Sequence, residues 1–270
     1  MIFAAAVLLG IIQGLTEFLP VSSSAHLILA RAFFGWEIPP EFGLAFDVAA
    51  HVGTLAAILV YFRAEIAGMI RSLPGVFSTN PDPSATLARL IVVGTIPVVI
   101  VALAFNDIIE QVLRTPAVAA AALAVGAVIM LAAERVRTPT RAEDSITWWE
   151  ALLIGCAQSA ALIPGMSRSG STISMGMFLG IRRDAAARFT FLLAIPAMVA
   201  AAAKEALELR EMPLPPDSGS LLVTGIVVSA VTGYLTIKFF LRYLGTNRLD
   251  LFAAYRLVLA AATMVWLLMQ

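Results

Sequence analysis

The sequence predicts an all-α membrane protein with six transmembrane helices, two re-entrant helical hairpins and an inverted-topology repeat. Three observations lead to this prediction. The 270 residues are 60% hydrophobic and only 13% charged, with a mean hydropathy of +0.91. Six stretches are apolar and long enough to cross a bilayer as helices. Two further apolar segments are interrupted by polar centres rich in proline and serine.

The composition excludes several classes of protein. A water-soluble domain of this size cannot hide so much apolar surface, and disorder requires low hydrophobicity. The 18 Lys and Arg balance the 18 Asp and Glu, so nothing favours a nucleic acid partner. The single cysteine, Cys156, cannot form an internal disulfide. The first basic residue is Arg31, so no secretory signal is expected at the N-terminus.

The six predicted crossings follow from length and apolarity. A hydrocarbon layer of ~30 Å needs ~20 helical residues, and ~17 suffice. The stretches that meet this requirement are 43–62, 89–106, 116–133, 189–203, 220–241 and 251–269.

The two predicted hairpins are the segments 2–30 and 148–181, each with a polar centre inside an apolar run. A continuous helix facing lipid would not tolerate such a centre. Broken helices enclosed by protein do, because neighbouring groups satisfy the freed backbone.

The placement of basic residues predicts the orientation, because Lys and Arg concentrate in cytoplasmic loops. Basic clusters follow the first and third crossings, precede the fourth, and lie between the fifth and sixth. All of them are cytoplasmic only if 148–181 enters and leaves on one side. The more acidic loops 107–115 and 204–219 then face outward, as do both termini.

The chain is also predicted to form one membrane domain, 1–270, built of two repeats at about 1–140 and 141–270. At an offset of about 144, Pro20 aligns with Pro164 and Ser23 with Ser167. Each half holds one hairpin and three crossings. Because three is odd, the two halves must point in opposite directions, and the functional site is expected where their broken segments meet near mid-membrane.

The first polar centre runs from Gln13 to His26. Gln13 and Glu17 are four residues apart and share one face of a helix. Ser22 and Ser23 follow a helix-breaking proline and supply hydroxyls at the start of a second helix. A helix N-terminus offers free N–H groups and favours an anion.

The second polar centre runs from Pro164 to Thr172. Arg168 lies deep in an apolar segment, where its charge is costly unless an anion or a carboxylate pairs with it. Its planar guanidinium suits phosphate oxygens, and Ser167, Ser169 and Thr172 add donors around it. Gly165 allows a tight backbone path. Together the two centres fit a buried phosphate or diphosphate.

Structural interpretations stay open beside this one. Glu17 and Arg168 form a purely structural ion pair in one alternative, and the serines merely satisfy broken helices in another. His26, taken alone, is equally compatible with a core histidine. Asp47 and His51, four apart on the first crossing, are expected to support the re-entrant loop rather than to bind substrate.

Both centres strongly resemble motifs of the bacterial undecaprenyl-diphosphate phosphatases of the bacitracin-resistance type, over 13–26 and 164–172. The resemblance implies a multi-pass protein of the bacterial inner membrane whose site opens toward the periplasm. It implies hydrolysis of a C55 polyprenyl diphosphate to undecaprenyl phosphate and inorganic phosphate, recycling the carrier for cell-wall synthesis. It also implies a divalent cation, Mg²⁺ or Ca²⁺. Assembly as a homo-oligomer stays open.

The site residues expected from the motifs fall into two groups. The catalytic residues are expected to be Glu17, Ser23, His26 and Arg168. The substrate-binding residues are expected to be Gln13, Ser22, Gly165, Ser167, Ser169 and Thr172. Gln13 stands where many family members have a glutamate, so Glu17 becomes the stronger candidate metal ligand.

The sequence leaves both the nucleophile and the class of function open. The preferred hypothesis has Ser23 attack phosphorus with His26 as its base. The rivals are attack by His26 itself or by a water that Glu17 activates. The alternative function is a lipid-carrier flippase or a small-anion secondary transporter using the same site, since inverted repeats with broken helices are common in transporters.

Overall fold

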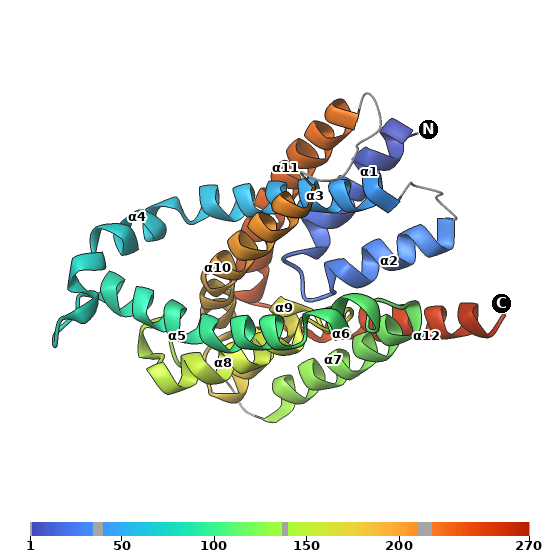
Figure 1. Ribbon diagram of the computed structural model, residues 1–270. Helices are drawn as coiled ribbons and strands as arrows, with labels where there is room; N and C mark the ends of the chain where they lie inside the picture. Colours follow the sequence, from blue (N-terminus) through green and yellow to red (C-terminus); the bar gives the residue numbers. More distant parts are fainter. Residues whose placement is uncertain (1, 35–39, 137–139, 210–217, 270) are drawn as a thin grey trace.

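The computed structural model describes residues 2–34, 40–136, 140–209 and 218–269. Across these ranges the chain forms twelve α-helices and two short 3₁₀ turns (Figure 1). Within them, extended backbone pairs at one isolated parallel bridge between Arg141 and Ile181. The prediction of an all-α protein is therefore confirmed.

Helices follow one another along both halves of the chain. The first half contains α1 (Ile2–Thr16), α2 (Ser23–Phe34), α3 (Pro40–Tyr61), α4 (Arg63–Arg71), α5 (Pro83–Ala104), α6 (Asn106–Gln111) and α7 (Pro116–Val136). The second half contains α8 (Trp148–Ala160), α9 (Arg168–Phe178), α10 (Arg183–Leu209), α11 (Ser218–Leu244) and α12 (Asp250–Leu268). The 3₁₀ turns are Leu73–Phe77 and Glu143–Ser145.

Five of the described helices are long and apolar enough to cross a membrane, namely α5, α7, α10, α11 and α12. They match five of the predicted crossings. The predicted crossing 43–62 corresponds to α3, whose part Ala45–Tyr61 meets the criterion together with α4, across a bend of 73°. The chain is thus a multi-pass membrane protein.

One predicted crossing differs clearly in length from its helix. The predicted stretch 189–203 lies inside α10, which runs from Arg183 to Leu209. The predicted stretch ends where the apolar run is interrupted by a charged residue, at Arg188 on one side and at Lys204 on the other. Charged residues are compatible with a helix that extends beyond the hydrocarbon layer, so composition alone underestimates its length.

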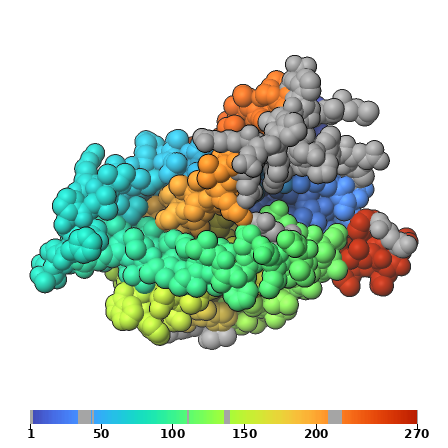
Figure 2. Space-filling model, in the orientation of Figure 1, coloured from blue at the N-terminus to red at the C-terminus, as the bar shows by residue number. Residues whose placement is uncertain are grey.

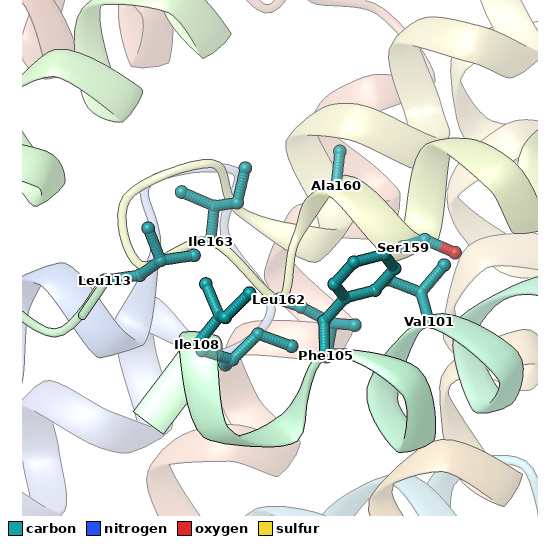
Figure 3. Close-up of a pocket in the computed structure, with 9 residues that line it drawn as sticks. Val101, Phe105, Ile108, Leu113, Ser159, Ala160, Leu162 and Ile163 are labelled. Atoms are coloured by element: carbon teal, nitrogen blue, oxygen red, sulfur yellow. The ribbon is translucent and has the colours of Figure 1, made fainter. Parts of the chain in front are cut away.

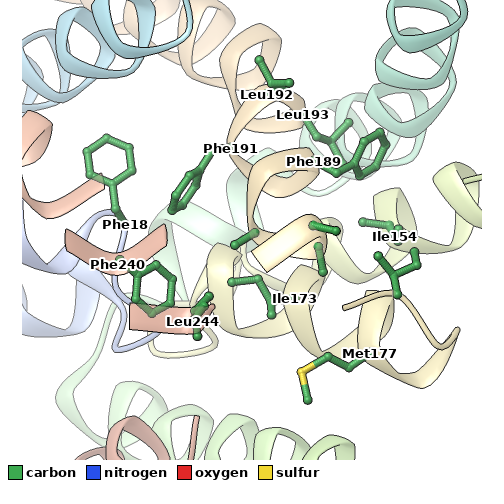
Figure 4. Packing of buried hydrophobic residues seen from close by; sticks show 14 of the residues in the cluster. Phe18, Ile154, Ile173, Met177, Phe189, Phe191, Leu192, Leu193, Phe240 and Leu244 are labelled. Atoms are coloured by element: carbon green, nitrogen blue, oxygen red, sulfur yellow. The ribbon is translucent and has the colours of Figure 1, made fainter. Parts of the chain in front are cut away.

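The core lies where α9, α10 and α11 meet, and it is rich in aromatic side chains (Figure 4). Phe18 meets Phe191 edge to face with ring centroids 5.5 Å apart, and Phe240 meets Phe252 at 5.4 Å. Such pairs add about 0.5–1.5 kcal/mol each beyond their buried area. Most residues of α9, a helix rich in Ser and Gly, are buried, so the helix lies inside protein rather than against lipid.

The hairpin helices approach helices of the other half of the chain closely. Gly155 on α8 lies against Gly94 on α5, so that a Cβ at position 155 would sit 2.1 Å from the carbonyl oxygen of Gly94. On the other side, α1 packs against α11. Small residues permit this spacing in membrane helices.

Ion pairs bring several of the basic clusters together. The buried carboxylate of Glu134 binds Arg183 and also Arg248, whose Nε lies 3.2 Å from it. Arg188 pairs with Glu65 at 2.7 Å and with Glu143 at 3.2 Å. These residues are distant in sequence, so the pairs join connectors that the charge pattern assigned to one side of the membrane.

The outer surface of α5 is strongly apolar, and the helix runs across one face of the molecule (Figure 2). Val92, Ile96, Ile100 and Leu103 each expose between 47% and 79% of their surface. Exposed large side chains in a continuous row suit contact with lipid rather than with water.

Candidate active site

The two polar turns meet inside the molecule. The first joins α1 to α2 and the second joins α8 to α9. The backbone N–H of Gly165 donates to Ser22 Oγ at 3.1 Å, and the hydroxyl of Ser169 donates to the carbonyl of Leu19 at 3.0 Å. The structure therefore brings together the two centres that the sequence placed in one site.

The turns share an unusual backbone conformation. Ser22 has φ = 72° and Ser167 has φ = 68°, each just before a helix begins. Left-handed φ is uncommon for residues other than glycine and clusters at functional sites. In conformation the counterpart of Ser167 is thus Ser22, not Ser23 as the offset of 144 predicted. The reason is that the second turn is one residue longer.

The hydroxyls of these serines stabilise the turns in the same way. Ser22 Oγ lies 3.2 Å from Ser24 Oγ, and Ser167 Oγ lies 3.2 Å from Ser169 Oγ. Ser167 also accepts a hydrogen bond from the N–H of Gly170 at 3.2 Å, which makes it the N-cap of α9. A cap of this kind contributes about 1 kcal/mol.

Glu17 is the centre of the polar cluster. Its Oε2 accepts hydrogen bonds from Ser23 Oγ at 2.7 Å and from Gln13 Nε2 at 2.9 Å. Its Oε1 lies 3.5 Å from Arg168 Nη1, and the side chain is only 4% exposed. Gln13 and Glu17 therefore lie on one face, as their separation of four residues predicted. Removing the charged partner of a buried carboxylate typically costs about 3–5 kcal/mol.

Arg168 is the more open member of the ion pair, with 28% of its side chain exposed. A guanidinium carries five N–H donors in a planar fork. Because Glu17 meets one of its nitrogens, the group can also bind a second anion. The cluster thus combines a hydroxyl, a carboxylate that accepts its proton, and a cation suited to phosphate.

His26 takes part in a different set of contacts. Its Nδ1 lies 2.7 Å from the carbonyl oxygen of Ser22, and its Nε2 lies 2.7 Å from the hydroxyl of Tyr255. A carbonyl can only accept, so Nδ1 carries a proton. The rings of His26 and Tyr255 also stack, with centroids 5.6 Å apart. Both ring nitrogens are engaged, and the hydroxyl of Ser23 points to Glu17 instead.

His51, on α3, is the histidine that reaches the carboxylate. Its Nδ1 donates to the carbonyl of Asp47 at 2.8 Å, and its Nε2 lies 3.9 Å from Glu17 Oε2. The Asp47 side chain pairs with Arg31 through bonds of 2.5 and 2.8 Å. Of the two residues expected to support the loop, His51 therefore lies beside the cluster.

Two residues that were predicted to bind substrate, Thr172 and Gly165, instead make structural contacts behind the second turn. Thr172 is fully buried, donates to the carbonyl of Arg168 at 2.7 Å and accepts from Thr190 at 2.9 Å. Gly165 has φ = 102°, and a Cβ there would lie 2.4 Å from the carbonyl oxygen of Ala119. Thr172 thus lies behind the backbone of Arg168, and Gly165 lets the turn approach α7.

Arg256 was not predicted as a site residue, and it lies inside the predicted crossing 251–269. Its side chain is completely buried. It donates 2.8–3.3 Å hydrogen bonds to the carbonyl oxygens of Pro20, Ala122, Leu123, Gly165 and Met166. The guanidinium therefore links both turns to α7. The available signal was an arginine within an apolar span, which is functional by default.

The donor set is compatible with a divalent cation that the substrate helps to hold. Among the described residues, no group of three or more His, Cys, Asp or Glu could bind a metal. Glu17 offers a carboxylate, and Gln13 Oε1 is a buried oxygen with no hydrogen-bond partner in the described part of the chain. Mg²⁺ commonly uses one or two carboxylates together with substrate phosphates. Two oxygens beside a phosphate site fit that pattern.

Comparison with known families agrees with this geometry. The family model described as bacitracin resistance protein BacA matches residues 6–262. The chain belongs to the BacA family. Both polar turns and Arg256 lie within the matched region.

Three relatives of this BacA-family chain show how far the similarity extends. Undecaprenyl-diphosphatase 2 of Stutzerimonas stutzeri (strain A1501) is 45% identical over 263 residues, 96% of each chain. The undecaprenyl-diphosphatase of Rubrobacter xylanophilus is 40% identical over 98% of each chain. That of Chlorobium chlorochromatii is 42% identical over 95% of this chain and 94% of its own. The similarity thus covers nearly the whole length.

Proposed function

We propose that this protein is an undecaprenyl-diphosphate phosphatase of the bacterial inner membrane, which returns the lipid carrier to cell-wall synthesis as undecaprenyl phosphate. Membership of the BacA family and the names of relatives at 40–45% identity support the activity. The observation that carries the assignment is the Ser23–Glu17–Arg168 cluster at the meeting of the two turns.

The diphosphate is held by positive groups that the two turns bring together. Arg168 binds its oxygens, and α2 and α9 direct their positive N-terminal ends toward the same turns. Arg256 adds a buried positive charge behind them. Phosphoryl transfer depends mainly on such positioning and charge neutralisation. Ser22, Gly165, Ser167, Ser169 and Thr172 maintain the turns that place Arg168.

In the first step, Ser23 Oγ attacks the terminal phosphorus while its proton passes to Glu17. The bond between that phosphorus and the bridging oxygen breaks, and undecaprenyl phosphate leaves with the bond's electron pair. The hydrogen bond of 2.7 Å already directs the Ser23 proton at the carboxylate. Protonation of Glu17 then frees the charge of Arg168 for the transferred phosphate.

In the second step, water attacks the phosphoserine and gives one proton to Nε2 of His51, which lies 3.9 Å from Glu17. The bond from phosphorus to Ser23 Oγ breaks, and Glu17 returns its proton to that oxygen. Hydrogen phosphate leaves, and His51 releases its proton to water. The contacts of His26 with Ser22 and Tyr255 give it the role of holding the turn.

A divalent cation, Mg²⁺ or Ca²⁺, would be held by Glu17 and by the unpartnered amide oxygen of Gln13. When bound, the cation would neutralise charge on the two phosphates.

The proposed architecture is one membrane domain, 1–270, in which repeats of about 1–140 and 141–270 insert in opposite directions with six crossings. The packing supports this architecture. The hairpin helix α1 of the first half contacts α11, the middle crossing of the second half, and the hairpin helix α8 of the second half contacts α5, the middle crossing of the first half. The twin conformations of Ser22 and Ser167 also support it. The predicted outward direction of the hairpin 2–30 favours a site open to the periplasm.

The decisive experiment is phosphate release from C55 diphosphate in detergent micelles, where no gradient can drive transport. The wild type should release phosphate, and Glu17→Gln and Arg168→Ala should each lower kcat about 10²- to 10³-fold. Arg63→Ala removes an exposed arginine and should change nothing. Turnover within threefold of wild type in Arg168→Ala would contradict the site. A wild type that releases no phosphate would favour the transporter.

The nucleophile is tested by rapid quenching with substrate labelled on the terminal phosphate. The mechanism predicts acid-stable phosphoserine at Ser23. Acid-labile phosphohistidine at His26 would show that the rival mechanism is correct.

A further inference from the structure

An apolar cavity of about 340 Å³ opens on the surface between α5, α6 and the turn that follows α8 (Figure 3). Phe105 and Ile108 line it from one side, and Leu162 and Ile163 line it from the other. The polar member of the lining is Ser159, whose hydroxyl donates to the carbonyl of Gly155 at 3.2 Å. The cavity therefore offers hydrocarbon contacts to an occupant and has the size of a small-ligand site.

The cavity and the phosphate site share one turn of the chain. Ile163 lies at the edge of the cavity, and its carbonyl accepts from the N–H of Met166 at 3.1 Å. Within that same turn, Gly165 bonds to Ser22, and the carbonyls of Gly165 and Met166 accept from Arg256. The turn 162–166 thus contacts the cavity through Leu162 and Ile163 and the polar centre through Gly165 and Met166.

We propose that this cavity holds the part of the prenyl chain that follows its first isoprene unit. This proposal rests on the proposed function. A prenyl diphosphate joins an anionic head directly to a branched hydrocarbon, so its binding site needs a polar and an apolar surface in succession. The turn 162–166 supplies that succession. The exposed row Ile100, Leu103 and Phe105 on and just after α5 continues the apolar surface outward, where the rest of the C55 chain remains in lipid.

Filling the cavity should lower kcat/KM for substrates with a long prenyl chain and leave kcat/KM for short substrates unchanged. The variant is Ile108→Trp, on α6 and outside the phosphate-binding turns. It should lower kcat/KM about 10-fold for C55 diphosphate and leave kcat/KM for the C5 compound dimethylallyl diphosphate within about twofold, because a C5 chain barely extends beyond the head. Val112→Trp places the same side chain on a neighbouring exposed residue outside the lining and should affect neither substrate.

A second variant, Phe105→Ala, enlarges the cavity without adding bulk and should also reduce kcat/KM for C55 diphosphate selectively. Equal losses on both substrates, or no loss on C55 diphosphate, would overturn the assignment of the cavity. Those results would leave the phosphatase activity itself standing. If the wild type released phosphate from neither substrate, the proposed function would fail instead.

Discussion

The N–H of Gly165 donates a hydrogen bond of 3.1 Å to the hydroxyl of Ser22, 143 residues earlier in the chain. This contact fixes the two polar turns against each other in the interior. The groups that it orders come from both turns, with Glu17 and Ser23 on one side and Arg168 on the other. The geometry of the cluster therefore depends on a backbone that only a residue without a side chain can provide at position 165.

Gly165→Ala should therefore abolish activity and reduce stability. A methyl group at this position would lie 2.4 Å from the carbonyl oxygen of Ala119, and φ = 102° is strained for alanine. We expect a loss of about 2–4 kcal/mol, seen as a lower midpoint of thermal unfolding in detergent. Gly219→Ala is the control, since a Cβ there meets nothing within 4 Å. Equal behaviour of the two variants would contradict this account.

Arg256→Lys should preserve the charge and still lower kcat about 100-fold. Lysine has three donors on a flexible stem and cannot reach the five carbonyls that the guanidinium holds. The turns should then separate, which limited proteolysis or hydrogen exchange at 17–22 and 161–167 would detect. The exposed Arg135→Lys is the matched control. Full activity of Arg256→Lys would show that charge alone suffices.

Gln13→Glu should increase the affinity for Mg²⁺. A second carboxylate beside Glu17 adds an anionic oxygen at the position of the unpartnered amide oxygen. We expect the half-saturating Mg²⁺ concentration to fall about 10-fold, equivalent to about 1.4 kcal/mol. Titration calorimetry of Mg²⁺ into the purified protein provides a second readout. Gln111→Glu, on exposed α6, should change neither measurement. An unchanged Mg²⁺ dependence in Gln13→Glu would remove Gln13 from the cation site.

His51→Gln should slow the hydrolysis of the phosphoenzyme more than its formation. Glutamine fills similar space but cannot carry the water proton, so kcat should fall about 10- to 100-fold. The ratio kcat/KM should stay within about threefold, because it reports the formation of the phosphoenzyme and not its hydrolysis. Labelled phosphoserine should accumulate in the quenched reaction. Exposed Asn247→Ala, far along the chain from both turns, should behave as wild type. A variant that is slow yet accumulates no phosphoenzyme would show that His51 acts earlier.

Glu150 should contribute stability that depends on pH. Hydrogen bonds from Arg141, at 2.5 and 3.0 Å, and from Thr147 lower the pKa of Glu150 to about 2, although partial burial opposes the shift. A carboxyl with a lowered folded pKa stabilises the folded state above its unfolded pKa, near 4.5. That contribution disappears as the pH falls from about 4.5 to about 2.

Glu150→Gln should therefore lower the free energy of unfolding by about 1–3 kcal/mol at pH 7. Near pH 2 the free energies of unfolding of the variant and the wild type should be equal. Thermal unfolding in detergent across this range measures the difference. Asp144→Asn, an exposed residue in the 3₁₀ turn before α8, should follow the wild-type curve. A constant difference between wild type and Glu150→Gln at every pH would contradict the assignment.

Much of the site was predictable because it follows from helical spacing and the cost of buried charge. Gln13 and Glu17 had to share a face at a separation of four residues, and Arg168 needed an anion inside an apolar segment. Five crossings were predictable from apolarity alone. The length of α10 was not, because its ends carry charges such as Arg188 that the apolar criterion excludes.

Other parts of the site depend on contacts that no local pattern contains. Arg256 is satisfied by carbonyl oxygens of the two polar turns and of α7, and a sequence does not show which carbonyls an arginine will reach. His26 bonds to Tyr255, 229 residues away, so its closeness to Ser23 in sequence suggested a partnership that the hydroxyl direction does not support. Similarly, the alignment at an offset of 144 matched Ser23 with Ser167, whereas the residues that share a positive φ are Ser22 and Ser167, one residue away from that alignment.

The carboxylate and the guanidinium of the cluster come from different turns, Glu17 from the first and Arg168 from the second. Neither turn alone therefore carries a complete reaction centre. A chain cut between α7 and α8 would be active only if its two pieces associated with each other in the membrane.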